Sequence, residues 1–215
     1  MMAEQVMSVG TPENIVGVIS RLLTDLVARN DQLPLAPTQV TPFHSSKPPT
    51  ISVKSYLEDR ILKYAGCSEE TFILALIYMD QVVQFNPEFV ISSLNVHRLL
   101  ITSIMLASKF FDDVYYNNAY YARVGGISNV EVNSLEMEML RMISFSLFVQ
   151  PDQYERYRCS LYSHMAPAQN VMGAGAPEVA QGPDASAAAM GLTASEQQAA
   201  NASVVASASA DPMVD

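Results

Sequence analysis

The chain has 215 residues, of which 49% are hydrophobic, and it carries a formal net charge of −10. This length accommodates one ordinary domain with tails, and the apolar content is ample for a packed core. The acidic balance extends to both sides of residue 166, which disfavours the basic surfaces that nucleic-acid binding and membrane attachment need. We therefore expect a protein that binds neither nucleic acid nor a membrane.

Motifs that would indicate a catalytic, metal-binding or exported protein are absent from the sequence. No apolar run reaches the roughly 18 residues of a membrane span, and the N-terminus lacks the basic-then-apolar pattern of a signal peptide. Cys67 and Cys159 lie far apart, and no two histidines have metal-ligand spacing. A glycine-rich phosphate loop and a nucleophile elbow are also missing. We expect a non-catalytic protein without cofactors or metals, located in the cytoplasm, the nucleus or both.

The first predicted elements are two helices joined by a proline-rich connector. Thr11 can cap a helix that starts at Pro12, because proline suits the first helical position, and this helix ends near Asn30. Residues 31–50 contain five prolines and predict an extended connector. A second helix is predicted from about Val53 to Tyr64.

The next two predicted helices are the most apolar. Ser68 caps the third, which stops at Asn86-Pro87. The fourth runs from about Asn95 to Phe111 and is apolar almost all round, which is typical of a helix surrounded by others. We therefore expect an all-α bundle with this helix at its centre.

Three further helices complete the predicted domain. The tyrosine-rich run at residues 115–121 predicts a short helix, and the capping box at residues 128–131 opens another. Pro151-Asp152 starts a last helix that ends near His164. The predicted domain thus spans residues 11–165, after a flexible N-terminus at residues 1–10. Residues 166–215 are rich in alanine and serine with few large apolar residues, so we expect this tail to be disordered.

Two charged residues interrupt apolar patterns. Glu136 falls within the apolar stripe of its helix, and Lys109 lies one turn beyond the apolar Met105 in the central helix. A charge in apolar surroundings is costly unless it is paired. We hypothesise that Lys109 and Glu136 approach each other where their helices converge. From the pattern alone, an internal salt bridge or a solvated charge is the more common explanation.

Several motifs, in order along the chain, resemble the cyclin box. Residues 106–113, Leu-Ala-Ser-Lys-Phe-Phe-Asp-Asp, resemble its signature of a small-residue helix end, a lysine, an aromatic residue and two acids. Tyr78-Met79-Asp80 and the Phe-x-Leu exit at residues 145–147 are similar to its neighbouring helices. Residues 95–102 and 120–128 resemble the P-type or U-type cyclins more narrowly, a group that resembles the yeast phosphate-pathway cyclins.

The resemblance implies a single cyclin box that binds and activates a cyclin-dependent protein kinase as a heterodimer, in cell-cycle or nutrient-linked control. It implies kinase binding by the following residues: Lys109, Glu136, Leu140, Phe145, Leu147, Phe110, Asp112 and Asp113. It also implies a fold-holding pair between Arg60 and Asp80. The substrate-docking motif of mitotic cyclins is absent, so we do not expect their docking groove. Three alternatives are open: a DNA-binding factor of the same fold, a helical scaffold and a helical enzyme.

Overall fold

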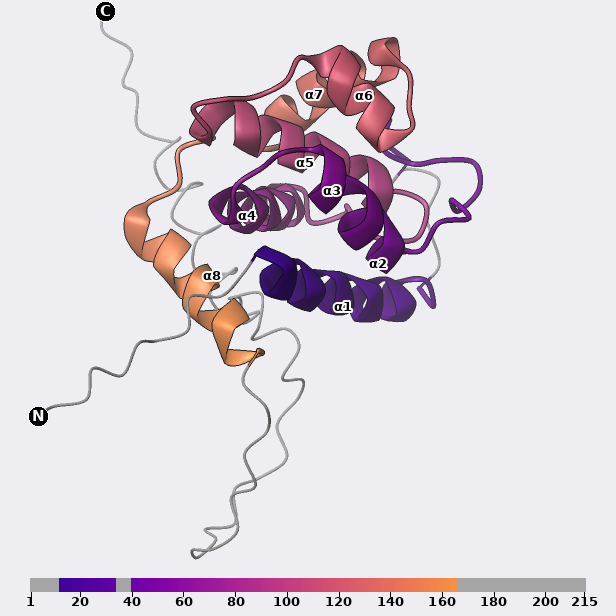
Figure 1. Ribbon diagram of the computed structural model, residues 1–215. Helices are drawn as coiled ribbons and strands as arrows, with labels where there is room; N and C mark the ends of the chain where they lie inside the picture. The colour runs from indigo at the N-terminus through magenta and orange to yellow at the C-terminus, as the bar shows by residue number, and fades with distance from the viewer. Residues whose placement is uncertain (1–11, 34–39, 166–215) are drawn as a thin grey trace, which may run out of the picture. The chain divides into compact units, whose positions relative to one another are not determined.

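The computed structural model describes residues 12–33 and 40–165, with side chains from Ile15 onward, and every regular element in these ranges is a helix. Figure 1 shows their arrangement. The elements are α1 (Pro12–Asn30), α2 (Val53–Ser55), η2 (Tyr56–Ile61), α3 (Leu62–Tyr64), α4 (Glu69–Phe85), α5 (Val96–Phe111), α6 (Asn118–Gly125), α7 (Asn129–Met142) and α8 (Pro151–Ser163). The all-α class is confirmed. The predicted flexible terminus at residues 1–10, the Thr11 cap and the predicted disordered tail at residues 166–215 lie outside the described residues.

Helix α5 lies at the centre of the bundle, as its composition predicts. Eleven of its sixteen residues are buried, and it packs against α4, α6 and α7. In Figure 1, α4 and α5 run through the middle, with α1 below them and α6 and α7 above. Helix α4 is nearly as enclosed, with twelve buried residues out of seventeen. The core is therefore built around a pair of apolar helices. Helix α5 carries Lys109 in its last turn.

The predicted helix starts are largely confirmed. Ser68 Oγ accepts the Thr71 N–H at the start of α4, and Ser128 Oγ accepts the Glu131 N–H at the start of α7. The capping box is only half formed, because the Glu131 carboxylate pairs with Arg98 at 2.6 Å. The tyrosine-rich helix begins later than predicted, at Asn118, since the Asn117 side chain caps it.

The predicted helix between Val53 and Tyr64 is one helical segment interrupted by a π-helical turn. The turn is η2, and the Leu62 N–H donates to the Leu57 carbonyl five residues earlier. Such turns insert one extra residue into an α-helix. Tyr56, Leu57 and Ile61 are all buried within it, so the bulge faces the core. Apolar spacing alone does not reveal this insertion.

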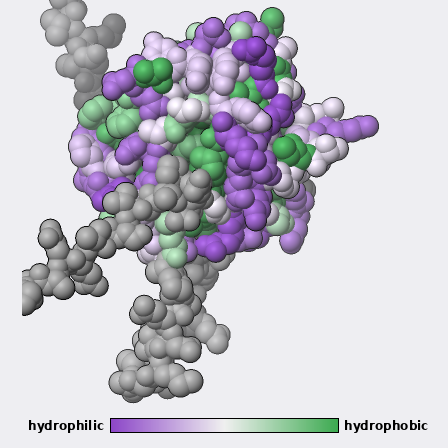
Figure 2. Space-filling model, in the orientation of Figure 1, coloured by the Kyte–Doolittle hydropathy of each residue, from purple (hydrophilic) through white to green (hydrophobic). Residues whose placement is uncertain are grey.

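No helix in residues 12–33 and 40–165 is long and apolar enough to cross a membrane. Figure 2 shows hydrophobic residues mixed among hydrophilic ones on the face seen in Figure 1, with a small hydrophobic group near the centre of the view.

The predicted pair between Arg60 and Asp80 is wrong. Arg60 donates to the Arg123 carbonyl at 3.3 Å and lies over the Tyr56 ring. Asp80 accepts hydrogen bonds from Tyr157 of α8 and from Gln84. Asp80 therefore ties α8 to α4.

Asp80 makes the stability of the domain depend on pH. Burial raises the pKa of its carboxyl group, although the hydrogen bonds from Tyr157 and Gln84 oppose this. A raised folded pKa means that its stabilising contribution is complete at low pH and is lost as the pH rises through the folded value. We expect the Asp80→Asn variant to gain stability relative to the native chain as the pH rises from about 4 to about 8. Urea unfolding at both pH values measures this, and an equal difference at both would contradict it.

Candidate functional site

Lys109 and Glu136, the two charges that interrupt apolar patterns, meet directly. Lys109 Nζ of α5 lies 2.5 Å from Glu136 Oε1 of α7. Asn118, the first residue of α6, links them: its Oδ1 accepts from Lys109 at 3.0 Å, and its Nδ2 donates to Glu136 Oε2 at 2.7 Å. The end of α5, the start of α6 and the middle of α7 thus converge on one polar cluster. Their proximity agrees with the hypothesis drawn from the sequence.

The polar cluster of Lys109, Asn118 and Glu136 is partly open to solvent. The side chains of Lys109 and Glu136 are 31% and 18% exposed, respectively. A lysine ammonium has three N–H donors, and two of them are used within the described residues. Lys109 also lies in the last turn of α5, where the helix dipole favours a positive charge. A fixed, partly dehydrated ammonium with one N–H left over can bind an acceptor on another molecule.

The two acids that follow α5 have different roles. Asp112 accepts hydrogen bonds from Ser68, Thr71 and Ser108 at 2.7–2.9 Å. Its carboxylate therefore joins the end of α5 to the start of α4, and it is committed inside the domain. Asp113 is exposed and makes no such bond within the described residues. Only Asp113 is available to a partner.

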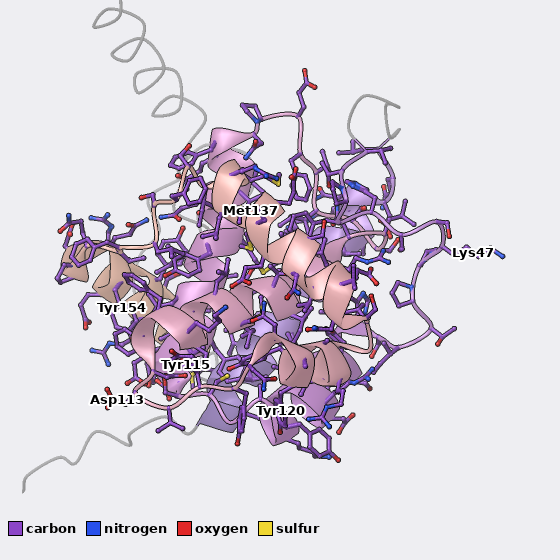
Figure 3. All side chains as sticks on the ribbon, turned by 90° about the horizontal axis from the view of Figure 1, so that it is seen from above. Lys47, Asp113, Tyr115, Tyr120, Met137 and Tyr154 are labelled. Atoms are coloured by element: carbon purple, nitrogen blue, oxygen red, sulfur yellow. The ribbon has the colours of Figure 1, made fainter. Side chains whose placement is uncertain are left out.

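The predicted apolar contacts differ in their exposure. Phe145 and Phe110 are 61% and 50% exposed, respectively, whereas Leu140 and Leu147 are half-buried. Leu140 lies one turn after Glu136 on α7, about 6 Å along the helix axis. Figure 3 shows Met137 of α7, Tyr154 of α8, and the Asp113 and Tyr115 loop on the same half of the view, opposite Lys47. Exposed aromatic rings thus directly follow Lys109 in the chain, at Phe110, and follow the end of α7, at Phe145.

The turn that presents Phe145 has an unusual backbone. Ser144 and Phe145 have φ angles of 51° and 58°, in the left-handed region that non-glycine residues seldom adopt. The Phe145 N–H donates to the Leu140 carbonyl at 2.7 Å, so the turn closes the end of α7. Each such residue costs on the order of 1 kcal/mol. The ring that this turn carries is 61% exposed.

The buried Tyr78 of α4 and the half-buried Asn86, which caps the end of that helix, hold this turn in place. Tyr78 Oη donates to the Leu147 carbonyl at 2.7 Å, and Asn86 Nδ2 donates to the Met142 carbonyl at 3.0 Å. The backbone is therefore held on both sides of the Phe145 turn, at Met142 and at Leu147. A fixed aromatic group loses little entropy when it binds a partner.

Sequence reasoning missed two contributors to this site. Asn118 lies in the tyrosine-rich run at residues 115–121, and the sequence predicts no role for it. A single asparagine at the start of a helix does not form a repeating pattern that would indicate its partner. For Tyr78 the sequence indicates only its place in the Tyr78-Met79-Asp80 motif, although a buried tyrosine usually has a hydrogen-bond partner. That rule would have predicted a partner for Tyr78, but not which one.

Comparison with known proteins gives consistent results. The family profile described as Cyclin matches residues 14–147, which include the polar cluster and the Phe145 turn. Cyclin-U4-1 of Arabidopsis thaliana is 46% identical over 154 residues, covering 70% of this chain and 76% of that protein. Cyclin-P4-1 of Oryza sativa subsp. japonica is 43% identical over 157 residues, covering 70% and 74%. Cyclin-U1-1 of Arabidopsis thaliana is 39% identical over 166 residues, covering 75% and 78%.

Proposed function

This chain belongs to the cyclin family, in its U-type and P-type group, and we propose that it binds and activates a cyclin-dependent protein kinase as a heterodimer, in cell-cycle or nutrient-linked control. Members of the family are regulatory, non-catalytic proteins. The observation that carries the proposal is the polar cluster of Lys109, Asn118 and Glu136, together with the exposed Phe145 turn that closes the end of α7, the helix that carries Glu136.

The proposed mechanism is conformational. A protein kinase is active when a glutamate on its regulatory helix pairs with the lysine of the ATP site. A rigid surface that binds this helix only in its inward position shifts the kinase toward the active state, by as much as its affinities for the two states differ. Here Phe145 supplies apolar contact, and Lys109 supplies a directed donor.

The neighbouring aromatic residues extend this surface. Phe110 and Phe111 are 50% and 54% exposed and follow Lys109 directly in the chain. Asp113 adds an exposed negative charge two residues later. An apolar area with a few fixed charges is typical of a protein–protein contact. Asp112 is left out of this surface, because its carboxylate is used inside the domain.

A gentle purification of the tagged full-length chain from cells tests the proposal. Mass spectrometry is expected to find a protein kinase in stoichiometric amount, and the purified complex is expected to phosphorylate a general substrate such as histone H1. The Phe145→Asp variant is the matched control. It replaces an exposed ring, which the domain does not need for folding, with a charged carboxylate in the proposed contact. A purified native chain that contains no kinase would contradict the proposal.

A further inference from the structure

A second site lies at the opposite end of α5 from Lys109. It is a pocket of about 230 Å³ lined by Tyr56 and Arg60 of η2, His97 and Arg98 of α5, and the loop residues Ile51 and Gly126, among others. His97 and Lys109 are twelve residues apart, which corresponds to about 18 Å along a helix. In Figure 3 the labelled Lys47, which lies between the pocket-lining Ser45 and Pro49 in the chain, is far from Asp113 and Tyr115. The pocket is therefore separate from the polar cluster.

The pocket gathers positive charge in an acidic protein. Two arginines line it, and none of its described lining residues is an aspartate or a glutamate. Arg60 and Arg98 each make one hydrogen bond, to the Arg123 carbonyl and to Glu131 respectively. Since a guanidinium has five N–H donors, most of these donors have no partner within the described residues.

The guanidinium groups of Arg60 and Arg98 both affect the pKa of the Tyr56 hydroxyl, which lines the pocket. The Tyr56 hydroxyl donates to the Gly125 carbonyl at 3.1 Å. Burial raises the pKa of this hydroxyl, and the positive charges of Arg60 and Arg98 both oppose the rise. Of the two, Arg60 lies over the Tyr56 ring, with its guanidinium carbon 6.0 Å from the ring centroid.

Rigid groups fix the position of Arg60. Its guanidinium lies over the Tyr56 ring and against Gly126, where an added Cβ atom would come within 2.9 Å of both terminal nitrogens. Gly126 has a φ of 73°, so the turn also requires a glycine for its backbone. The His97 ring packs edge-on against the Tyr56 ring, with centroids 4.9 Å apart, and donates from Nε2 to the Ile51 carbonyl at 2.9 Å. A held guanidinium is a preorganised anion receptor.

The size and lining of the pocket limit the ligand. Pockets for small molecules usually measure about 300–1,000 Å³, so this one suits a single side chain. Ile51, Leu94 and Ile127 add apolar surface, which a bare ion would leave uncovered. Glu131 already balances the charge of Arg98, so the match lies in the donors: the remaining N–H groups of two guanidiniums suit the three acceptor oxygens of a phosphate ester better than the two of a carboxylate.

We infer that this pocket binds a phosphorylated side chain of a peptide segment, through Arg60 and Arg98. The inference is independent of kinase activation, because the pocket and the polar cluster share no residue. The site would recruit an already phosphorylated protein to the domain.

Peptide selection on the full-length chain tests the inference. The immobilised chain is offered an equimolar mixture of three pools of nine-residue peptides with random flanks and a central phosphoserine, serine or glutamate. Mass spectrometry is expected to show enrichment of the phosphoserine pool. The affinity of one enriched peptide is then measured by fluorescence anisotropy, and Arg60→Gln is expected to lower it by about tenfold or more.

Arg123→Gln is the matched control. Arg123 also lies over a tyrosine ring, that of Tyr120, but it does not line the pocket. It is expected to leave affinity nearly unchanged, and both variants are expected to keep the native helical circular dichroism signal. Equal retention of the three pools, or equal losses in the two variants, would overturn the inference. The inference would also be overturned if inorganic phosphate displaced the peptide at a concentration equal to the dissociation constant of the peptide. The site would then recognise the free ion alone and not a peptide segment. Copurification of a kinase with Arg60→Gln separates this result from the proposed function.

Discussion

Alanine at either Lys109 or Glu136 is expected to abolish kinase activation while the domain stays folded. Lys109→Ala removes the donor proposed to bind the kinase, and Glu136→Ala removes the group that fixes this donor. Losing one partner of a charged hydrogen bond across an interface typically costs about 2–5 kcal/mol of binding, which is a loss of affinity of roughly 30-fold or more. The pair is partly exposed, so we expect the free energy of unfolding to fall by only about 1 kcal/mol. The measurements are the activity of the reconstituted kinase complex and urea unfolding of the free chain.

Each variant has a matched control in the same chain. Glu138 lies on α7 near Glu136 and pairs with Arg141 at 3.6 Å, and Lys63 pairs with Asp59 at 3.4 Å. Glu138→Ala and Lys63→Ala each remove a paired charge outside the polar cluster, and both are expected to retain activation. Undiminished activity in both Lys109→Ala and Glu136→Ala would show that the polar cluster is only structural.

The Asp112→Ala variant is expected to lose about 3 kcal/mol of stability, because hydrogen bonds to a charged group contribute about 1.5–3 kcal/mol each. Its carboxylate accepts from the hydroxyls of Ser68, Thr71 and Ser108, and Ser108 in turn accepts from Tyr121. Removing the carboxylate leaves these part-buried hydroxyls without their acceptor. The free energy of unfolding, measured by urea denaturation, tests this.

Asp113→Ala provides the comparison, since it removes the neighbouring acid from an exposed position. Its stability is expected to change by less than about 0.5 kcal/mol. If Asp113 contacts a kinase, this variant is expected to weaken copurification of the kinase without destabilising the chain. Equal stability of the two alanine variants would contradict the internal role of Asp112.

Local signals in the sequence predicted most of the fold. Ser68, Ser128 and Pro151 mark helix starts because caps and prolines act within a few residues. The burial of α5 followed from its apolar composition. The approach of Lys109 and Glu136 followed from the cost of an unpaired charge in apolar surroundings.

Hydrogen-bond partners far apart in the chain, and the direction in which a side chain points, could not be predicted in the same way. The resemblance paired Asp80 with Arg60, whereas the packing of α8 brings Tyr157 to it. Asp112 and Asp113 are identical in type and adjacent, so only the end of α5 decides which one faces inward. The resemblance treated these two acids alike.

The π-helical turn between Tyr56 and Ile61 has a consequence for sequence alignment. A regular α-helix would join the same flanking residues, facing the same way, with one residue fewer. In a relative without this turn, the segment is therefore expected to be one residue shorter, and a gap within residues 56–61 restores the correspondence on both sides. Without that gap, Arg60 and the pocket it lines would be compared with positions that face a different direction.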